Sequence, residues 1–186
     1  MKAIDRWIQS YRFNVASRHV PSGVRVLDVG SSDGAFFRHL GSRLGAGVGI
    51  DEDVEQNIDF DNFSLVQGRF PDDLPAGEAF DAIVMLAMLE HVQPEHQPAL
   101  ASACFDHLKP GGRVVLTVPA PFVDRILEAL VKLRLIDGMA VHQHYGFRPE
   151  KTPGIFGPAG FELEKHRRFQ LGLNHLFVLR RREIDA

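Results

Sequence analysis

The stretch VRVLDVGSSDG, residues 24–34, decides the fold. Its first six residues are mostly apolar and β-branched, which predicts a short buried strand. The strand ends at a turn in which Gly30 and Gly34 lack a Cβ, so the backbone can bend sharply and approach a ligand closely. A helix is expected from residue 35 to residue 44, and its first backbone N–H groups would face an anionic group at the turn.

Strands and helices alternate along the rest of the chain. Further strands are predicted at residues 47–51, 64–67, 80–85 and 113–118, and a helix at residues 94–107. Near-continuous apolar strands that alternate with helices indicate a parallel sheet covered on both faces. Residues 161–168 and 175–181 have the form of a final antiparallel hairpin. The sequence therefore predicts a doubly wound, Rossmann-like α/β fold with a seven-stranded, mainly parallel sheet and an antiparallel C-terminal strand pair.

Composition limits the possible functions. The 186 residues, 45% apolar and 24% charged, fit one globular domain, and a net charge of −3 argues against nucleic-acid binding through a broad basic face. Positive charge gathers at residues 166–168 and 180–182, which we interpret as solvated strand ends. The single Cys104 excludes an intramolecular disulfide and a cysteine zinc site. Because the sequence has no signal peptide and no apolar run of about 20 residues, we expect a cytoplasmic protein without a transmembrane segment.

Two carboxylates follow the first two strands. Asp28 lies at the end of the first strand, and Asp51 ends the second, where it is placed to accept hydrogen bonds from two ribose hydroxyls. Taken singly, Asp28 could cap the turn, and Asp51 could be an acid at a helix start. The four residues that follow Gly30 do not fit the G-x-G-x-x-G spacing, which disfavours a nicotinamide dinucleotide.

Three ordered segments resemble the class I S-adenosylmethionine-dependent methyltransferases. Residues 26–36 (VLDVGSSDGAF) resemble motif I, residues 80–92 (FDAIVMLAMLEHV) the fourth-strand motif, and residues 108–116 (LKPGGRVVL) the turn into the fifth strand. The likeness covers roughly residues 24–181 and is closest to the branch that methylates small molecules, quinones and lipids. It implies S-adenosyl-L-methionine as the cofactor and a small-molecule or lipid-like methyl acceptor.

The resemblance also implies roles for single residues. Gly30 would lie under the methionine portion of the cofactor, and Asp28 would orient its amino end. Leu86 or Ala87 would offer a backbone carbonyl to the same amino group, and Asp51 would bind the ribose. The full set expected to bind the cofactor is Asp28, Gly30, Ser31, Ser32, Gly34, Asp51, Glu52, Gly68, Arg69, Phe70, Leu86 and Ala87.

Two positions depart from the family pattern. Ser32 stands where members usually carry glycine, so the loop is less flexible. Arg69 stands where they commonly carry an aspartate that accepts from the adenine amino group, and arginine has no acceptor. A backbone carbonyl near Gln67 or Gly68 would then accept instead, while Phe70 could pack on the adenine. These departures motivate an alternative, a non-catalytic S-adenosylmethionine-binding or interaction module.

Candidate catalytic residues are histidines. Methyl transfer from a sulfonium is an in-line displacement, so a general base is needed only for a hydroxyl or protonated amine acceptor. His91 follows the fourth strand and could equally be structural. His142 and His144, with Tyr145, lie in the region where family members build the acceptor pocket. The two histidines could also hold a metal, but no further ligand cluster supports one, so none is predicted.

We expect a single methyltransferase domain over residues 1–186. Residues 1–22 would form an N-terminal helix that packs on the cofactor site, residues 23–118 the cofactor-binding half, and residues 119–186 the acceptor-side half. The apolar stripe of residues 122–136 suits core packing, a homodimer contact, a lid over the acceptor or a lipid-facing edge. In the N-terminal helix one face is apolar: Ile4, Trp7, Ile8, Tyr11 and Val15.

Overall fold

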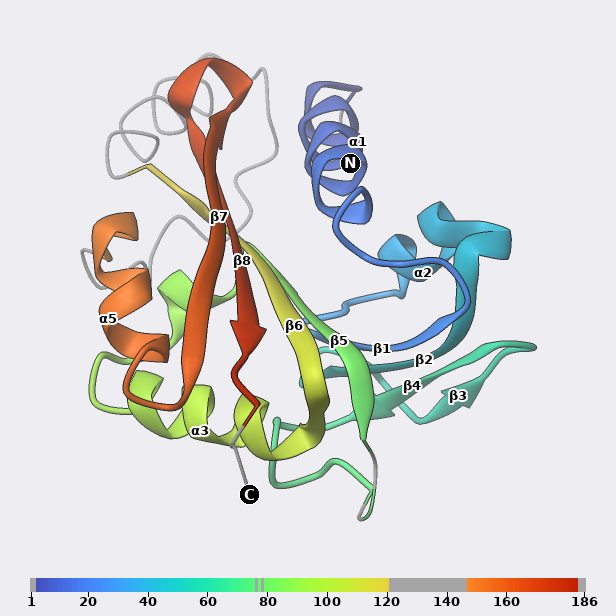
Figure 1. The fold of residues 1–186 in the computed structure, drawn as a ribbon. Helices are drawn as coiled ribbons and strands as arrows, with labels where there is room; N and C mark the ends of the chain where they lie inside the picture. The colour runs from blue at the N-terminus through green and yellow to red at the C-terminus, as the bar shows by residue number, and fades with distance from the viewer. Residues whose placement is uncertain (1–2, 76, 78, 121–146, 184–186) are drawn as a thin grey trace.

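The computed structural model describes residues 3–75, 77, 79–120 and 147–183 and contains one eight-stranded sheet in the order β3-β4-β2-β1-β5-β6-β8-β7 (Figure 1). Its strands are β1 (Val24–Val29), β2 (Leu44–Asp51), β3 (Ile58–Asp59), β4 (Phe63–Gln67), β5 (Phe80–Leu86), β6 (Leu108–Pro119), β7 (Phe161–Phe169) and β8 (Asn174–Arg181).

The direction of the strands confirms the predicted topology. Strands β4, β2, β1, β5 and β6 pair in parallel, while β8 is antiparallel to both β6 and β7. The predicted number of seven strands is too low by one, because β3 adds an antiparallel pairing at the edge, beside β4. Two residues are too few to show the alternation by which a strand is recognised in a sequence.

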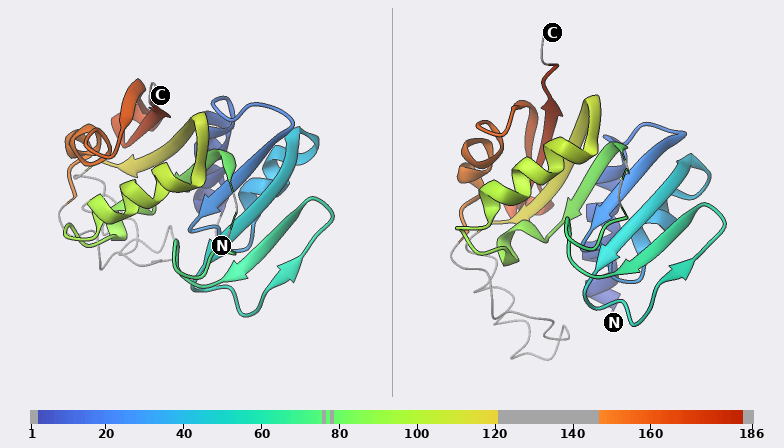
Figure 2. Two further views of the ribbon diagram at one scale, coloured as in Figure 1. Left: turned by 60° about the horizontal axis from the view of Figure 1, so that its bottom comes forward. Right: turned by 90° about the horizontal axis from the view of Figure 1, so that it is seen from below.

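Helices cover both faces of the sheet. They are α1 (Ala3–Ser17), α2 (Ala35–Leu40), α3 (Gln97–His107) and α5 (Thr152–Phe156), with 3-10 turns η1 (Gly41–Arg43), η2 (Leu89–His91), η3 (Pro149–Lys151) and η4 (Gln170–Gly172). One core cluster joins the sheet to α3 and α5, and the other joins it to α1 and α2 (Figure 2). Central strands therefore bury both of their sides, as Ile83 and Met85 of β5 face one core and Ala82 and Val84 the other.

Several element boundaries differ from the prediction. The first helix after the glycine loop stops at Leu40 rather than at residue 44, because Gly41 takes a φ of 54° and turns the chain into η1. Helix α3 begins three residues later than predicted, and β6 begins at Leu108, five residues earlier. Helix α5 was not predicted, since Pro153 and Gly154 give its five residues a low helix propensity.

The predicted N-terminal helix is present as α1, but its apolar face is only partly covered. Val15 and Ala16 near its end are buried in the α1–α2 core. Trp7 and Tyr11, by contrast, remain 62% and 37% exposed. The first half of α1 thus extends past the core that holds its second half. Across the described ranges, no helix is both long and apolar enough to cross a bilayer.

Candidate functional site

The site is built at the carboxyl edge of the parallel strands. Strand β1 lies between β2 and β5, so the chain order reverses at β1. Ligands of open α/β sheets bind in the crevice at such a switch point. Asp28 in β1 pairs with Gly49 of β2 and Val84 of β5, and Asp51 is the last residue of β2. The structure thus brings both predicted carboxylates to one edge.

Asp51 ties three loops together through its carboxylate and its backbone carbonyl. Its Oδ2 accepts a hydrogen bond from the Ser32 backbone N–H at 2.8 Å, and its Oδ1 accepts one from the Asp53 N–H at 2.9 Å. The Asp51 backbone carbonyl accepts from the Gly68 N–H at 3.1 Å. Because every contact is to backbone, the loops that follow β1, β2 and β4 converge on this residue and hold its side chain in one orientation.

The glycine loop is as tightly turned as the sequence predicted. Gly30 has a φ of 80°, and a Cβ added there would lie 3.0 Å from Cγ of Met88 in the turn after β5. Gly34 has a φ of 76°. Ser32 has a φ of 47°, in the left-handed region that favours glycine, which gives a physical reason for the glycine usual at this position.

The start of α2 gives no support to the expected anion site. The N–H of Ala35 already donates to Oδ1 of Asp33 at 3.1 Å, and the N–H of Gly34 donates to the carbonyl of Ser31 at 2.9 Å. The helix has only six residues, so it has few aligned peptide dipoles. Binding groups at this edge are therefore side chains and loop backbone.

Asp28 is the most perturbed carboxyl of the site. Its side chain is buried, at 3% exposure, and burial together with the neighbouring charge of Asp51 raises its pKa to about 7. Two carboxylates at one edge, one of them poorly hydrated, favour a ligand that brings a positive charge.

Glu52 and Arg69 form the outer rim of the site. The guanidinium holds the Glu52 carboxylate with two contacts, Nε to Oε1 and Nη2 to Oε2, each 2.8 Å long. The Arg69 backbone N–H donates to Oδ2 of Asp73 at 2.8 Å. A Cβ at Gly68 would clash with the side chain of Asp73, so the loop packs closely against that residue. Since both partners are exposed, this pair closes a loop rather than building a buried charge site.

Three further predicted cofactor contacts, Phe70 after β4 and Leu86 and Ala87 at the end of β5, are held by neighbouring elements. The Phe70 ring lies edge-on to His107 of α3 with the ring centres 5.4 Å apart, so it is packed partly against the α3 face. Strand β5 ends at Leu86, and Ala87 turns the chain at a φ of 58° while its N–H donates to the Thr117 carbonyl at 2.9 Å. That hydrogen bond fixes the peptide that joins Leu86 to Ala87.

The candidate catalytic histidines divide into two groups. His91 lies in η2 beside the site, half-buried, with its backbone N–H bonded to the Met88 carbonyl at 2.9 Å. His142, His144 and Tyr145 lie outside the described residues, as does the predicted helix at residues 122–136. Within the described ranges, no group of three or more histidine, cysteine or acidic side chains could hold a metal ion.

Arg12 and Glu90 interact electrostatically, which the sequence did not predict. Burial lowers the pKa of Arg12 in α1, and the charge of Glu90 acts in the opposite direction. Glu90 lies in η2 at only 2% exposure, and Arg12 Nε is buried without a hydrogen-bond partner within the part of the chain that the structure describes. The sequence did contain one indication of this interaction: Arg12 lies four residues after Ile8, so a basic residue interrupts the apolar face of α1.

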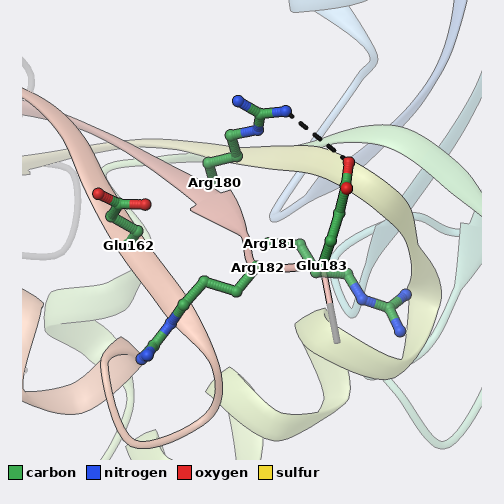
Figure 3. A pocket seen from close by; sticks show the side chains of 5 residues that line it. All are labelled: Glu162, Arg180, Arg181, Arg182 and Glu183. Atoms are coloured by element: carbon green, nitrogen blue, oxygen red, sulfur yellow. Dashed lines mark ion pairs between the residues drawn. The ribbon is translucent and has the colours of Figure 1, made fainter. Parts of the chain in front are cut away.

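A separate pocket lies away from this edge. It is lined by Glu162, Arg180, Arg181, Arg182 and Glu183, and Arg180 pairs with Glu183 at 4.0 Å (Figure 3). Strand β8 runs antiparallel to β6, so its final residues lie at the amino edge of the parallel strands. The pocket is therefore remote from Asp28 and Asp51.

Comparison with known proteins identifies the family. The model of the methyltransferase domain family matches residues 3–166. A ubiquinone biosynthesis O-methyltransferase of Xanthomonas axonopodis pv. citri is 32% identical over 164 residues, which cover 81% of this chain and 67% of that protein. A mitochondrial ubiquinone biosynthesis O-methyltransferase of Mus musculus is 32% identical over 162 residues, 77% of this chain and 42% of that protein. The chain thus spans less than half of the mouse relative's length.

A solved structure shows the same fold. The 1,6-didemethyltoxoflavin-N1-methyltransferase of Burkholderia thailandensis, determined with S-adenosylhomocysteine bound, superimposes with a TM-score of 0.69 at 17% identity over 96% of this chain and 82% of its own. Together with the family match over residues 3–166, these likenesses show that the chain belongs to the methyltransferase domain family and is a class I S-adenosylmethionine-dependent methyltransferase.

Proposed function

We propose that this chain transfers the methyl group of S-adenosylmethionine to a hydroxyl group of a small, quinone-like or other lipid-like acceptor. The bacterial and mouse relatives both carry the name ubiquinone biosynthesis O-methyltransferase, which supports oxygen as the methylated atom. The observation that carries the proposal is the pair of carboxylates at the switch point, with the pKa of Asp28 raised to about 7. Such a pair suits a cofactor with a cationic amino group and a ribose.

The charged groups of the site fit the cofactor's polar groups one by one. Asp51 would accept from the ribose hydroxyls, using the lone pairs that its two backbone bonds leave free. Asp28 would face the amino group, and Gly30, which has no Cβ, would let the methionine portion approach the backbone of the turn. Arg12, whose Nε is buried without a hydrogen-bond partner among the described residues, would meet the carboxylate. When bound, S-adenosylmethionine supplies a methyl group activated by its sulfonium.

The other predicted contacts would complete the binding site. Ser31, Ser32 and Gly34 form the turn around the cofactor, and the carbonyl of Leu86 or Ala87 would meet its amino group. A backbone carbonyl near Gly68 would accept from the adenine amino group, with Phe70 beside the ring. Glu52 and Arg69 would close the outer rim above the ribose.

The chain's part in the reaction is to position the acceptor and to remove a proton. The acceptor oxygen forms a bond to the methyl carbon as the carbon–sulfur bond breaks, and the electron pair of that bond stays on sulfur. His91 lies at the same edge of the sheet and is the base we assign to the hydroxyl proton, with His142 and His144 as the alternatives. A closed site also excludes water from the sulfonium.

Calorimetry and a methyl-transfer assay test this proposal. We expect saturable binding of S-adenosylhomocysteine to the wild type, and transfer of radiolabelled methyl from S-adenosylmethionine to 4-hexylcatechol. Asp51→Ala should weaken binding by about 1.5–3 kcal/mol for each charge-assisted hydrogen bond lost. Asp59→Ala, which removes an exposed carboxylate from β3, is the matched control and should bind normally. An unchanged dissociation constant for Asp51→Ala would place the ribose elsewhere.

The strained loop favours a second candidate function, that of a non-catalytic S-adenosylmethionine-binding module. The turn requires a φ of 47° at Ser32, and this left-handed conformation is unfavourable for a serine. Binding of S-adenosylhomocysteine without methyl transfer to catechols, phenols or amines would support this module. Absence of saturable binding at millimolar cofactor would refute both functions.

A further inference from the structure

Three large apolar side chains lie exposed together at one end of the molecule. Trp7 and Tyr11 of α1 are 62% and 37% exposed, and Leu171 at the end of the β7–β8 hairpin is fully exposed, at 101%. The helix and the hairpin are tied at this point, because Nε2 of Gln170 donates to the Ile8 carbonyl at 3.0 Å. Figure 1 shows the start of α1 and the η4 turn at the same end of the fold. We call Trp7, Tyr11 and Leu171 the apolar tip.

Packing among the described residues does not explain the apolar tip. Leu171 has a φ of 58° and Gln170 one of 50°, so two consecutive residues other than glycine occupy the left-handed region. An exposed leucine in a disfavoured conformation contributes nothing to the core. The rings are nevertheless held in place, since Tyr11 stacks on Phe169 at 6.1 Å and lies 5.9 Å from Trp7. The tip is therefore a preformed apolar surface.

Positive charge is concentrated on β7 next to the apolar tip. Lys165, Arg167 and Arg168 are exposed on β7 just before the turn, and no acidic residue occurs from residue 165 to residue 182. Burial lowers the pKa of His19, which follows α1, and the charge of Lys165 lowers it further. Glu164 acts in the opposite direction, while Arg167 again lowers it. Lys165 and Arg167 therefore lie on the side of β7 that faces the end of α1, with one acid beside them. Arg6 adds an exposed cation from α1 itself. This contrasts with the net charge of −3 for the whole chain.

Aromatic and leucine side chains flanked by lysine and arginine suit the interface of an anionic bilayer, where rings lie at the headgroups and cations meet the lipid charge. We propose that the apolar tip docks this protein on the surface of an anionic membrane. A second copy of the chain fits less well, because a stable interface buries about 800 Å² on each partner, more than three side chains supply.

Docking through the apolar tip would turn the carboxyl edge of the sheet, which carries the candidate cofactor site, toward the lipid. Strand β8 begins at Asn174, opposite Pro119 at the carboxyl end of β6, so the η4 turn extends beyond the same edge that carries Asp28 and Asp51. The proposal does not depend on the acceptor or on turnover. Its failure would leave the methyltransferase function untouched.

The only tryptophan of the chain lies in the tip, so its fluorescence is a direct probe. The full chain is titrated with phosphatidylcholine vesicles that contain 30% phosphatidylglycerol, and with vesicles of phosphatidylcholine alone. We expect a saturable blue shift of Trp7 with the anionic vesicles, much weaker with the neutral ones and suppressed by 0.5 M salt. An equal response to both vesicles, or none to either, would overturn the proposal.

Two pairs of variants test whether vesicle binding depends on the apolar tip or on any similar substitution at the protein surface. Leu171→Asn should reduce the partition coefficient about tenfold; Leu163→Asn, at the other end of β7, should not. Arg167→Glu should reduce it roughly twenty-fold because two charges change; Arg180→Glu, beside the remote pocket, should not. Equal losses for the members of either pair would contradict docking through the tip. A blue shift that grows with protein concentration in the absence of vesicles would instead indicate self-association, and would overturn the membrane assignment.

Discussion

At the scale of single residues, the site depends on carboxylates whose surroundings differ. Asp51 is held by the backbone N–H groups of Ser32 and Asp53, while Asp28 is buried close to it. The positions of both could be predicted from the sequence, because each follows a recognisable strand. The raised pKa of Asp28 could not, since it arises from burial and from a neighbour 23 residues away along the chain.

Asp28 should make stability and cofactor affinity respond to pH in opposite directions. In the unfolded chain its carboxyl ionises near pH 4, and in the folded protein near pH 7, so the unfolded state holds fewer protons between these values. The free energy of unfolding should therefore fall as pH rises through this window, by up to about 4 kcal/mol from this group. Binding of the cofactor's ammonium group should strengthen over the same rise, as Asp28 ionises.

Asp28→Asn tests both effects at once. Urea unfolding and calorimetry from pH 5 to pH 8 should show a flatter stability profile in the variant, and a higher stability than the wild type at pH 8. Its affinity for S-adenosylmethionine should be lower and less dependent on pH. Parallel pH profiles in the two proteins would show that Asp28 is already ionised in the folded state at pH 5.

Ser32→Gly should stabilise the protein. Glycine occupies the observed φ of 47° without the Cβ strain of serine, and this gain exceeds the added freedom of the unfolded chain. We expect an increase of about 0.5–1 kcal/mol, or about 2 °C in Tm, with cofactor binding retained. Ser102→Gly in α3 provides the control, because glycine at an exposed helical position should lower Tm. A lower Tm for Ser32→Gly would mean that the serine side chain stabilises the turn.

At the scale of elements, the strands were more predictable than the short helices. Strands such as β1 and β5 are apolar runs bounded by turns, a pattern contained within the segment itself. Helix α5 and strand β3 have no such pattern and form because neighbouring elements pack against them. The exposed half of α1 also escaped prediction, since helical periodicity shows which residues share a face but not how far the core extends beneath it.

Arg12 and Glu90 should couple α1 to the turn after β5. Arg12→Leu would leave the buried Glu90 carboxylate without the charge of Arg12, and we expect a loss of about 3–5 kcal/mol in the free energy of unfolding. The double variant Arg12→Leu/Glu90→Leu should recover most of that loss. A double-mutant cycle measured by urea unfolding gives the coupling energy. Additive losses in the two single variants would show that the side chains act independently.

At the scale of the molecule, one hydrophobic core packs on each face of the sheet, and the candidate site lies at the carboxyl ends of the parallel strands. Residues of β5 bury their side chains on both faces, while the loops after β1, β2 and β4 converge on Asp51. The order of strands could be predicted because alternating strands and helices allow few topologies. The convergence on the one residue Asp51 could not be predicted, because it depends on the three-dimensional course of three loops.

Cofactor binding should therefore stabilise the whole domain rather than one loop. A ligand that binds only the folded state at 100 times its dissociation constant adds about 2.7 kcal/mol, which corresponds to a Tm rise of roughly 5–10 °C for a domain of this size. We expect S-adenosylhomocysteine to produce this rise in the wild type and in Asp59→Ala, measured by differential scanning calorimetry. Asp51→Ala should show little of it, because the proposed ribose contact and the side-chain bonds to the Ser32 and Asp53 N–H groups are lost together. The reduced nicotinamide dinucleotide should leave Tm unchanged. A comparable rise in Tm with this dinucleotide would contradict the conclusion, based on the glycine spacing after Gly30, that the chain does not bind it.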